Sequence, residues 1–347
     1  MTVDGVIVTG MHRSGTSAVT SVLEAMGLYV GTPEELTAAS WENPRGFFER
    51  RDLRGICDGL LWGTDADWWQ LSGFSVDAIP DSVLAAHRGA FHALTERMHA
   101  NQPWAIKEPR LCLLLPVFEA LARRAVIVQP VRHPLEVARS LMRRNGIPLC
   151  AGIALWERYN RAAAVHSRDH VRVTVDYARL VAEPHGECAR IVEQLRTAGI
   201  GPLDPKAAVA RIEPDLHRER AAAASACGVP TGDFVGWPQQ ALWRAIADND
   251  AAAVEPECSA SVDEVLRAYE AEVARARAAD RTIRDLRNRE SPQSAQGDNN
   301  RADELAALQS ALEHEQARNH ALLASCSWRL TAPLRCVGAV FRGKRRR

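Results

Sequence analysis

A run of small, hydroxylated and basic residues near the N-terminus has the composition of a phosphate-binding loop. Residues 12–17 read His-Arg-Ser-Gly-Thr-Ser and follow the apolar β-branched run 6–8. Apolar residues then recur at helical spacing, with Gly27 where a helix would end. A buried strand, a tight turn and a helix are therefore expected in this order. Free backbone N–H groups and the helix dipole make such a junction attractive to an anion.

Each residue type in this loop suits phosphate binding. Gly15 permits the tight backbone, the hydroxyls of Thr16 and Ser17 donate to phosphate oxygens, the N–H of Ser14 points outward, and Arg13 supplies a full charge. The loop is not a Walker A loop, because no Lys precedes Thr16. This absence disfavours a nucleotide-dependent phosphotransferase, which stays an alternative function.

A second junction of strand and helix carries another set of polar residues. Arg132 follows the apolar run 125–128, Pro134 stands where it opens the next helix, and Ser140 lies two turns further on. We expect Arg132 and Ser140 to reach one point beside the sheet. A nucleotide phosphorylated at two positions needs two anion sites, and this chain offers two.

The two motifs resemble those of sulfotransferases that use 3′-phosphoadenosine 5′-phosphosulfate (PAPS). Residues 12–17 are similar to the 5′-phosphosulfate loop P-K-S-G-T-[ST], with Arg13 in place of Lys and His12 in place of Pro. The second motif keeps the spacing of the 3′-phosphate motif R-x-P-x-x-x-x-x-S. Residues 42–49 (ENPRGFFE) and 104–110 (WAIKEPR) resemble segments of the bacterial carbohydrate-type branch.

The resemblance covers roughly residues 5–245 and implies transfer of a sulfuryl group from PAPS to an acceptor hydroxyl or amine, with PAP as product and no metal. The leaving 5′-phosphate is a stable anion, so a positioned cation matters more than a strong acid. Arg13 fits this role, and Lys107 is a second cation unless it serves in a structural ion pair. The family also closes a basic loop over the 3′-phosphate, for which Arg218 is a weak candidate beside the alternative of a solvated helix face.

The acceptor hydroxyl must lose a proton, which requires a His or a carboxylate. The candidates are Glu49, Glu42, Glu108 and His12. Glu49 is favoured because it follows two aromatic residues, whose desolvation is expected to raise its pKa. Glu108 stands between basic residues and is expected to be salt-bridged.

Strands alternate with helices along the first 247 residues. Apolar runs predict strands near 6–8, 104–106, 125–128 and 171–175, while helices are expected at 16–26, 81–99, 134–144, 151–166 and 184–198, with an irregular stretch at 30–75. This order predicts an α/β fold with a parallel sheet covered on both faces. The resemblance implies the P-loop NTPase-like sulfotransferase form of that fold.

Three parts are expected along the chain: a sulfotransferase domain at 1–247, a helical or coiled-coil extension at 248–325 with a polar break near 291–300, and a basic tail at 326–347. Heptad-like apolar spacing suggests homo-oligomers through a coiled coil, although a solvated helix packed on its own domain is an alternative. Residues 327–335 (SWRLTAPLR) resemble a segment that follows coiled coils in bacterial glycan-modifying enzymes. This likeness implies a cell-surface saccharide or glycolipid acceptor. The basic residues suggest peripheral contact with the inner face of the membrane, and a solubilising tail is the alternative.

Composition limits which partners, metal sites and cellular locations are expected. Lys+Arg and Asp+Glu are equal at 43 each, which favours neither nucleic acid nor acidic polymers as partners. The 8 cysteines include no CxxC pair and no His at zinc spacing, so reduced thiols in a cytoplasmic protein without a metal site are expected. No secretory signal or membrane span is evident. A non-catalytic scaffold that keeps a PAP site is a further alternative, disfavoured by Arg13, Arg132 and Ser140.

Overall fold

A parallel sheet forms the centre of the computed structural model, which describes residues 3–39, 46–212 and 235–289. Within these residues the sheet has four strands in the order β2-β1-β3-β4. Their bounds are β1 (Gly5–Val8), β2 (Trp104–Lys107), β3 (Ala125–Val131) and β4 (Arg172–Asp176). Val8 pairs with Lys107 on one side and with Val128 on the other. Because all the strands run in parallel, the segments that follow them meet at one edge of the sheet.

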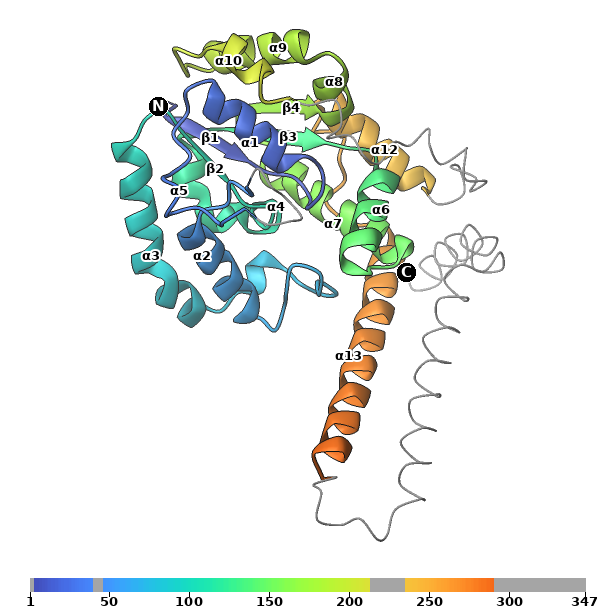
Figure 1. The fold of residues 1–347 in the computed structure, drawn as a ribbon. Helices are drawn as coiled ribbons and strands as arrows, with labels where there is room; N and C mark the ends of the chain where they lie inside the picture. Colours follow the sequence, from blue (N-terminus) through green and yellow to red (C-terminus); the bar gives the residue numbers. More distant parts are fainter. Residues whose placement is uncertain (1–2, 40–45, 213–234, 290–347) are drawn as a thin grey trace, which may run out of the picture. The chain divides into compact units, whose positions relative to one another are not determined.

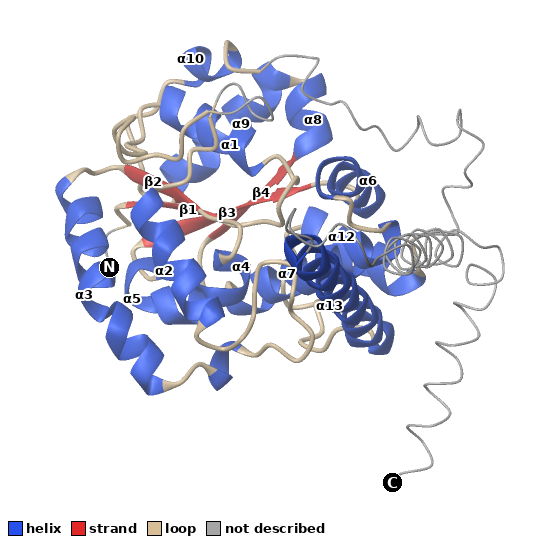
Figure 2. Ribbon diagram, turned by 60° about the horizontal axis from the view of Figure 1, so that its bottom comes forward, coloured by secondary structure: helices blue, strands red, loops and turns tan. Residues whose placement is uncertain are grey.

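Helices pack on both faces of this sheet. Figures 1 and 2 show α1, α8, α9 and α10 on one face and α4, α5 and α7 on the other. The predicted fold class, a parallel sheet flanked by helices, is confirmed. The bounds of these helices are α1 (Thr16–Ala25), α4 (Leu111–Leu114), α5 (Glu119–Ala122), α7 (Leu149–His166), α8 (Tyr177–Ala182), α9 (Pro184–Thr197) and α10 (Pro205–Val209).

The remaining described helices lie around this centre or follow it in the chain. They are α2 (Arg51–Trp62), the 3-10 turn η1 (Val76–Ala78), α3 (Asp81–Ala100), the 3-10 turn η2 (Leu115–Phe118), α6 (Pro134–Asn145), α12 (Trp237–Ala247) and α13 (Ala260–Arg289). None of the described helices is both long and apolar enough to cross a membrane.

The core under α1 shows why these strands are buried. Val6, Val8, Val126 and Val128 alternate along β1 and β3 and point to the same face, where they pack against apolar residues of α1 and α9. Strand β1 and the first four residues of β3 are apolar on both faces, as is usual where helices cover both sides of a parallel sheet. The rigid centre therefore fixes the positions of the loops at its carboxyl edge.

One element differs from the expectation. Residues 30–75 were expected to be irregular, but α2 runs through this stretch from Arg51 to Trp62. Its buried residues, Leu53, Ile56, Cys57, Leu60 and Leu61, recur at helical spacing and pack inward. The prediction was wrong because the Trp, Asp and Gly residues around them obscure this short periodicity.

The chain divides into two compact units, Met1–Val262 and Asp263–Arg347. The described part of the second unit is helical and ends with α13 at Arg289. The polar break at 291–300, the rest of the extension and the basic tail at 326–347 lie outside the described residues. The coiled coil and the proposed boundaries at 247 and 325 therefore stay predictions.

Candidate active site

The first loop forms a tight turn between β1 and α1, as predicted. Gly10, Arg13 and Gly15 all have positive φ, at 120°, 71° and 91° respectively. Such a value is uncommon for a residue other than glycine, and at Arg13 the hydrogen bond from Ser14 N to Met11 O (3.1 Å) closes the turn around it. Helix α1 begins without a side-chain cap and without an acidic residue in its first turn. An anion is therefore well suited to occupy this helix end.

Tyr177, directly after β4, packs on the turn. A Cβ atom added at Gly15 would lie 2.2 Å from Cδ2 of Tyr177, so only glycine fits there. The Tyr177 ring also lies 4.8 Å from the guanidinium carbon of Arg132. Tyr177 thus contacts both of the loops that the sequence predicts to bind anions. Sequence reasoning missed it, although its place at the carboxyl end of a strand was a usable signal.

The two loops contact each other directly. Nε of Arg13 donates to Oγ of Ser140 at 2.9 Å, and Nη1 of Arg132 donates to the carbonyl oxygen of Arg13 at 3.1 Å. Arg132 also donates from Nε to a carboxylate oxygen of Glu136 at 2.9 Å, and both of these side chains are buried. The structure therefore brings together Arg13, Arg132 and Ser140, which the sequence placed in one site. Glu136, which balances the charge of Arg132, was not foreseen.

Lys107 ends β2 and links this site to residues 46–50. Its Nζ donates to Oε1 of Glu49 at 2.6 Å, to the carbonyl oxygen of Phe47 at 3.0 Å and to Oγ of Ser17 at 3.3 Å. The Lys107 side chain is 2% exposed and that of Glu49 is 12% exposed. One cation therefore touches both the first turn of α1 and a candidate base.

The pairing with Lys107 reverses an expectation about Glu49. Burial by itself raises the pKa of Glu49, but the charge of Lys107 and its hydrogen bond outweigh burial, so the pKa lies below its ordinary value. The expected rise in pKa was wrong because the sequence does not reveal this partner, 58 residues away. Glu49 is therefore ionised at neutral pH.

His12 is half-buried, and its ring packs between two aromatic side chains. Its ring centroid lies 4.9 Å from that of Trp68 and 5.7 Å from that of Tyr159. Its Nε2 atom is buried and has no hydrogen-bond partner in the described part of the chain. Burial, together with nearby positive charges, holds the pKa of His12 well below its ordinary range, so the imidazole is neutral at pH 7. In order of effect these charges belong to Arg110, Lys107, Arg144 and Arg13.

Glu108 is fully buried and salt-bridged, as predicted. Nε of Arg110 donates to Glu108 at 2.8 Å, and the same guanidinium pairs with Asp58 of α2. Burial raises the pKa of Glu108, and the charge of Glu49 adds to the rise. With its oxygens held by Arg110, Glu108 is better placed to support the site than to take a proton. The other two candidates, Glu42 and Arg218, lie outside the described residues.

Comparison with known proteins bears on this site. The model of the sulfotransferase family matches residues 5–198, a span that includes both loops, Lys107 and Tyr177. Among the curated proteins no significant match is found.

Three solved structures are similar to the chain at low identity. The sulfotransferase domain from the curacin biosynthetic pathway is 14% identical, with a TM-score of 0.37 over 72% of this chain and 97% of that one. The sulfotransferase domain from the Synechococcus PCC 7002 olefin synthase is 16% identical, with a TM-score of 0.39 over 71% and 95%. Sulfotransferase STF1 from Mycobacterium tuberculosis H37Rv is 21% identical, with a TM-score of 0.34 over 60% and 71%. At these TM-scores the structural likeness carries no argument of its own.

Proposed function

Because the chain belongs to the sulfotransferase family, we propose that it transfers a sulfuryl group from PAPS to a hydroxyl or amine of an acceptor. The observation that carries this proposal is the direct contact of two anion-binding loops through Arg13, Ser140 and Arg132. PAPS carries phosphates at its 3′ and 5′ positions, so a pair of adjoining anion sites suits it.

The residues divide between the two ends of the donor. In the proposal, the N-terminus of α1 with Arg13, Ser14, Gly15, Thr16 and Ser17 binds the 5′-phosphosulfate. Arg132 and Ser140 bind the 3′-phosphate, with Arg218 as a further contact. Tyr177 holds the two loops together through Gly15 and Arg132.

The chemistry proposed is a displacement at sulfur. The acceptor oxygen forms a bond to sulfur, the bond from sulfur to the 5′-phosphate oxygen breaks, and the acceptor proton passes to Glu49. Lys107 and Arg13 stabilise the charge that grows on the leaving oxygen. Since Lys107 is paired with Glu49 before the reaction, protonation of Glu49 removes the counter-charge of Lys107. At that moment Lys107 is free to favour the leaving phosphate.

His12 is the second candidate base. The observation in its favour is a neutral imidazole whose buried Nε2 lacks a partner among the described residues. Comparing Glu49→Gln with His12→Gln separates the two roles, since only the variant of the true base loses turnover while retaining the affinity for PAP.

The acceptor proposed is a cell-surface saccharide or glycolipid, on the resemblance of residues 327–335. The basic residues of the tail at 326–347 support contact with the inner face of the membrane. The scattered cysteines support a cytoplasmic protein. A homo-oligomer formed through the coiled coil is proposed on the heptad spacing alone. Deleting residues 327–347 should abolish sedimentation with anionic liposomes, and unchanged sedimentation would remove the membrane proposal.

The first test is donor binding. Calorimetry in EDTA should detect binding of PAP, and absence of heat or a requirement for Mg²⁺ would contradict the proposal. A thermal-shift comparison of PAPS with ATP tests the phosphotransferase alternative. Turnover of labelled PAPS with an extract of surface glycans separates an enzyme from a scaffold that only binds PAP.

A further inference from the structure

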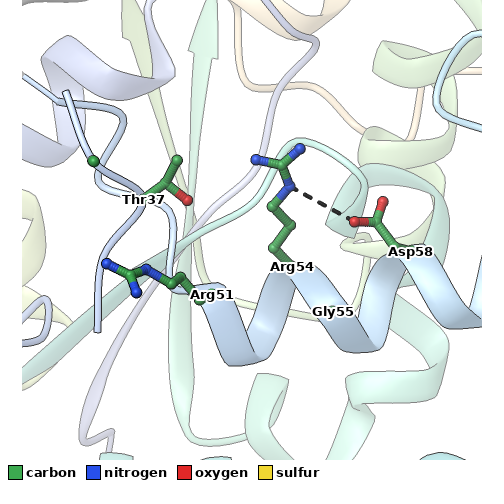
Figure 3. Close-up of a pocket in the computed structure, with 6 residues that line it drawn as sticks. Thr37, Arg51, Arg54, Gly55 and Asp58 are labelled. Carbon is green, nitrogen blue, oxygen red and sulfur yellow. Dashed lines mark ion pairs between the residues drawn. The ribbon is translucent and has the colours of Figure 1, made fainter. Parts of the chain in front are cut away.

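A positively charged pocket of about 310 Å³ opens between residues 37–38 and one face of α2. Figure 3 shows its side chains, with Arg51, Gly55 and Asp58 at successive turns of the helix. The lining residues are Thr37, Ala38, Arg51, Arg54, Gly55 and Asp58. None of them belongs to the donor loops described above.

The charge of this pocket is not balanced from within. Arg51 donates from Nε to the carbonyl oxygen of Leu36 at 3.0 Å, and no carboxylate of the described residues lies at ion-pair distance from it. Nε of Arg54 lies 3.7 Å from Asp58, which also pairs with the buried Arg110. The pocket therefore holds two arginines and one carboxylate, and that carboxylate pairs with Arg54 and with Arg110 outside the pocket.

An unpartnered hydroxyl faces the same space. The Oγ1 atom of Thr37 is buried and has no hydrogen-bond partner in the described part of the chain. In Figure 3 this hydroxyl points toward α2, between Arg51 and Arg54. A buried donor without a partner is unfavourable, so a ligand oxygen at this point would satisfy it.

Gly55 keeps the floor of the pocket open. Glycine inside a helix costs about 1 kcal/mol relative to alanine, so its presence calls for a reason. In the same helix, a Cβ at Gly59 would lie 2.0 Å from the ring of His87, which explains that glycine by packing. A Cβ at Gly55 would meet no atom within 4 Å. Glycine therefore leaves this part of α2 without a side chain, and the pocket reaches down to the helix backbone.

The pocket adjoins the proposed base. The N–H of Thr37 donates to the carbonyl oxygen of Glu49 at 2.7 Å. Helix α2 begins with Arg51, two residues after Glu49. The charge of Arg54 acts on the carboxyl group of Glu49 across this short separation. A molecule that presents its hydroxyl to Glu49 can therefore reach the pocket with a neighbouring group.

We propose that this pocket binds an anionic group of the acceptor, so that the substrate is an acidic saccharide with a carboxylate or a sulfate ester near the reacting hydroxyl. The two guanidinium groups supply the charge and the Thr37 hydroxyl supplies one more donor. That the acceptor is a saccharide follows from the proposed function. The anion site itself is inferred from the residues of the pocket.

Calorimetry on the full chain with saturating PAP tests the inference, because PAP occupies the donor loops. The probes are methyl β-glucuronide for a carboxylate, glucose 6-sulfate for a sulfate ester, and methyl β-glucoside as the neutral control. At least one charged probe should bind more tightly than the neutral one. Arg51→Gln and Arg54→Gln should each weaken it by about tenfold, as expected for a partly exposed charge-assisted hydrogen bond.

Matched variants protect the test against loss of folding. Gly55→Leu fills the pocket without removing a charge and should prevent binding, while Gly89→Leu places the same residue on α3, where a Cβ also meets no atom within 4 Å. Arg88→Gln on α3 removes an arginine outside the pocket. Both α3 variants should bind like the wild type.

The outcomes are decisive for each proposal separately. Equal binding of charged and neutral probes, or wild-type affinity in both arginine variants and Gly55→Leu, would overturn the anion pocket. If the wild-type protein binds the charged probes but not PAP, the assignment of the donor loops would be overturned and the anion pocket would stand. The arginine variants and their α3 control can also be compared without PAP, so the two proposals can fail independently.

Discussion

The pair of Lys107 and Glu49 gives the sharpest prediction, made by the substitution Glu49→Gln. Glutamine keeps the size of the side chain and an oxygen that can accept the hydrogen bond from Lys107, now 2.6 Å long. It removes the negative charge and the ability to take a proton. If Glu49 is the base, turnover of labelled PAPS should fall by about 10²–10⁴-fold. The affinity for PAP should not fall, because Glu49 belongs to neither proposed donor loop and its neutralisation leaves the charge of Lys107 unopposed.

Glu49→Gln should also lower the free energy of unfolding, and the contacts of Lys107 limit by how much. Breaking a buried ion pair by removal of one partner typically costs about 3–5 kcal/mol. Lys107 keeps its bonds to Phe47 and Ser17 in the variant, so the loss should lie at or below the lower end of this range. Urea unfolding measures it, and turnover is then expressed per folded molecule.

Two further variants make this reasoning refutable. Lys107→Met leaves the buried carboxylate of Glu49 without its partner, and the double variant Lys107→Met/Glu49→Gln should recover part of the lost stability but no activity. A Glu49→Gln protein that keeps more than about a tenth of the activity would refute the assignment, since general-base catalysis supplies more than that. His12→Gln would then be the variant expected to lose turnover.

The pH dependence provides an independent check. A base must be deprotonated to act, and the pKa of Glu49 lies below its ordinary value of 4.5. Turnover should therefore stay level as the pH falls from about 8 to about 5 and should decline only below that. An acid limb between about pH 6 and 7 would show that another group, with an ordinary histidine pKa, takes the proton.

Three other predictions follow from the site and its surroundings. Arg132→Gln should weaken PAP by about 10–100-fold and adenosine 5′-phosphosulfate hardly at all, and calorimetry showing equal losses would contradict the 3′-phosphate assignment. Gly15→Ala should abolish PAP binding and destabilise the fold by about 1–3 kcal/mol, because its Cβ would collide with the Tyr177 ring; wild-type calorimetry would refute this. The hydrogen bond from Arg50 holds the pKa of Glu35 well below its ordinary value. The ionised Glu35 therefore stabilises the fold above about pH 4.5, and this stabilisation is lost as the pH falls below that value. The destabilisation caused by Glu35→Gln, about 1–2 kcal/mol in urea unfolding at pH 7, should shrink at acid pH, and a constant difference would contradict the sign.

The sheet and its two loops could be predicted from the sequence because their signals are local. The runs 6–8 and 125–128 are apolar and β-branched, and each leads into a glycine or proline turn before a periodic helix. The parallel order then requires both loops to lie at one edge. The hydrogen bond between Arg13 and Ser140 is the physical result of that topology.

The ion pairs could not be predicted because they depend on contacts between distant segments. Glu49 follows two aromatic residues, and this local pattern suggested desolvation, but the opposing charge comes from the end of β2. In the same way Tyr177 meets Gly15 only because β4 and β1 flank β3. Helical spacing in α2 was present in the sequence but was hidden by its aromatic and glycine neighbours.

Three cations of the candidate site are paired with carboxylates. Arg132 is held by Glu136, Lys107 by Glu49, and Arg110 by Glu108 and Asp58. Isolated cations buried beside one another would repel and would be costly to desolvate, so these carboxylates keep them ionised and fixed in position. Of these carboxylates, Glu49 is the one proposed above to accept the proton of the acceptor. In the proposed reaction, the pairing of Lys107 with Glu49 is therefore weakened at the step in which the leaving phosphate gains charge, so Lys107 would contribute most in the transition state.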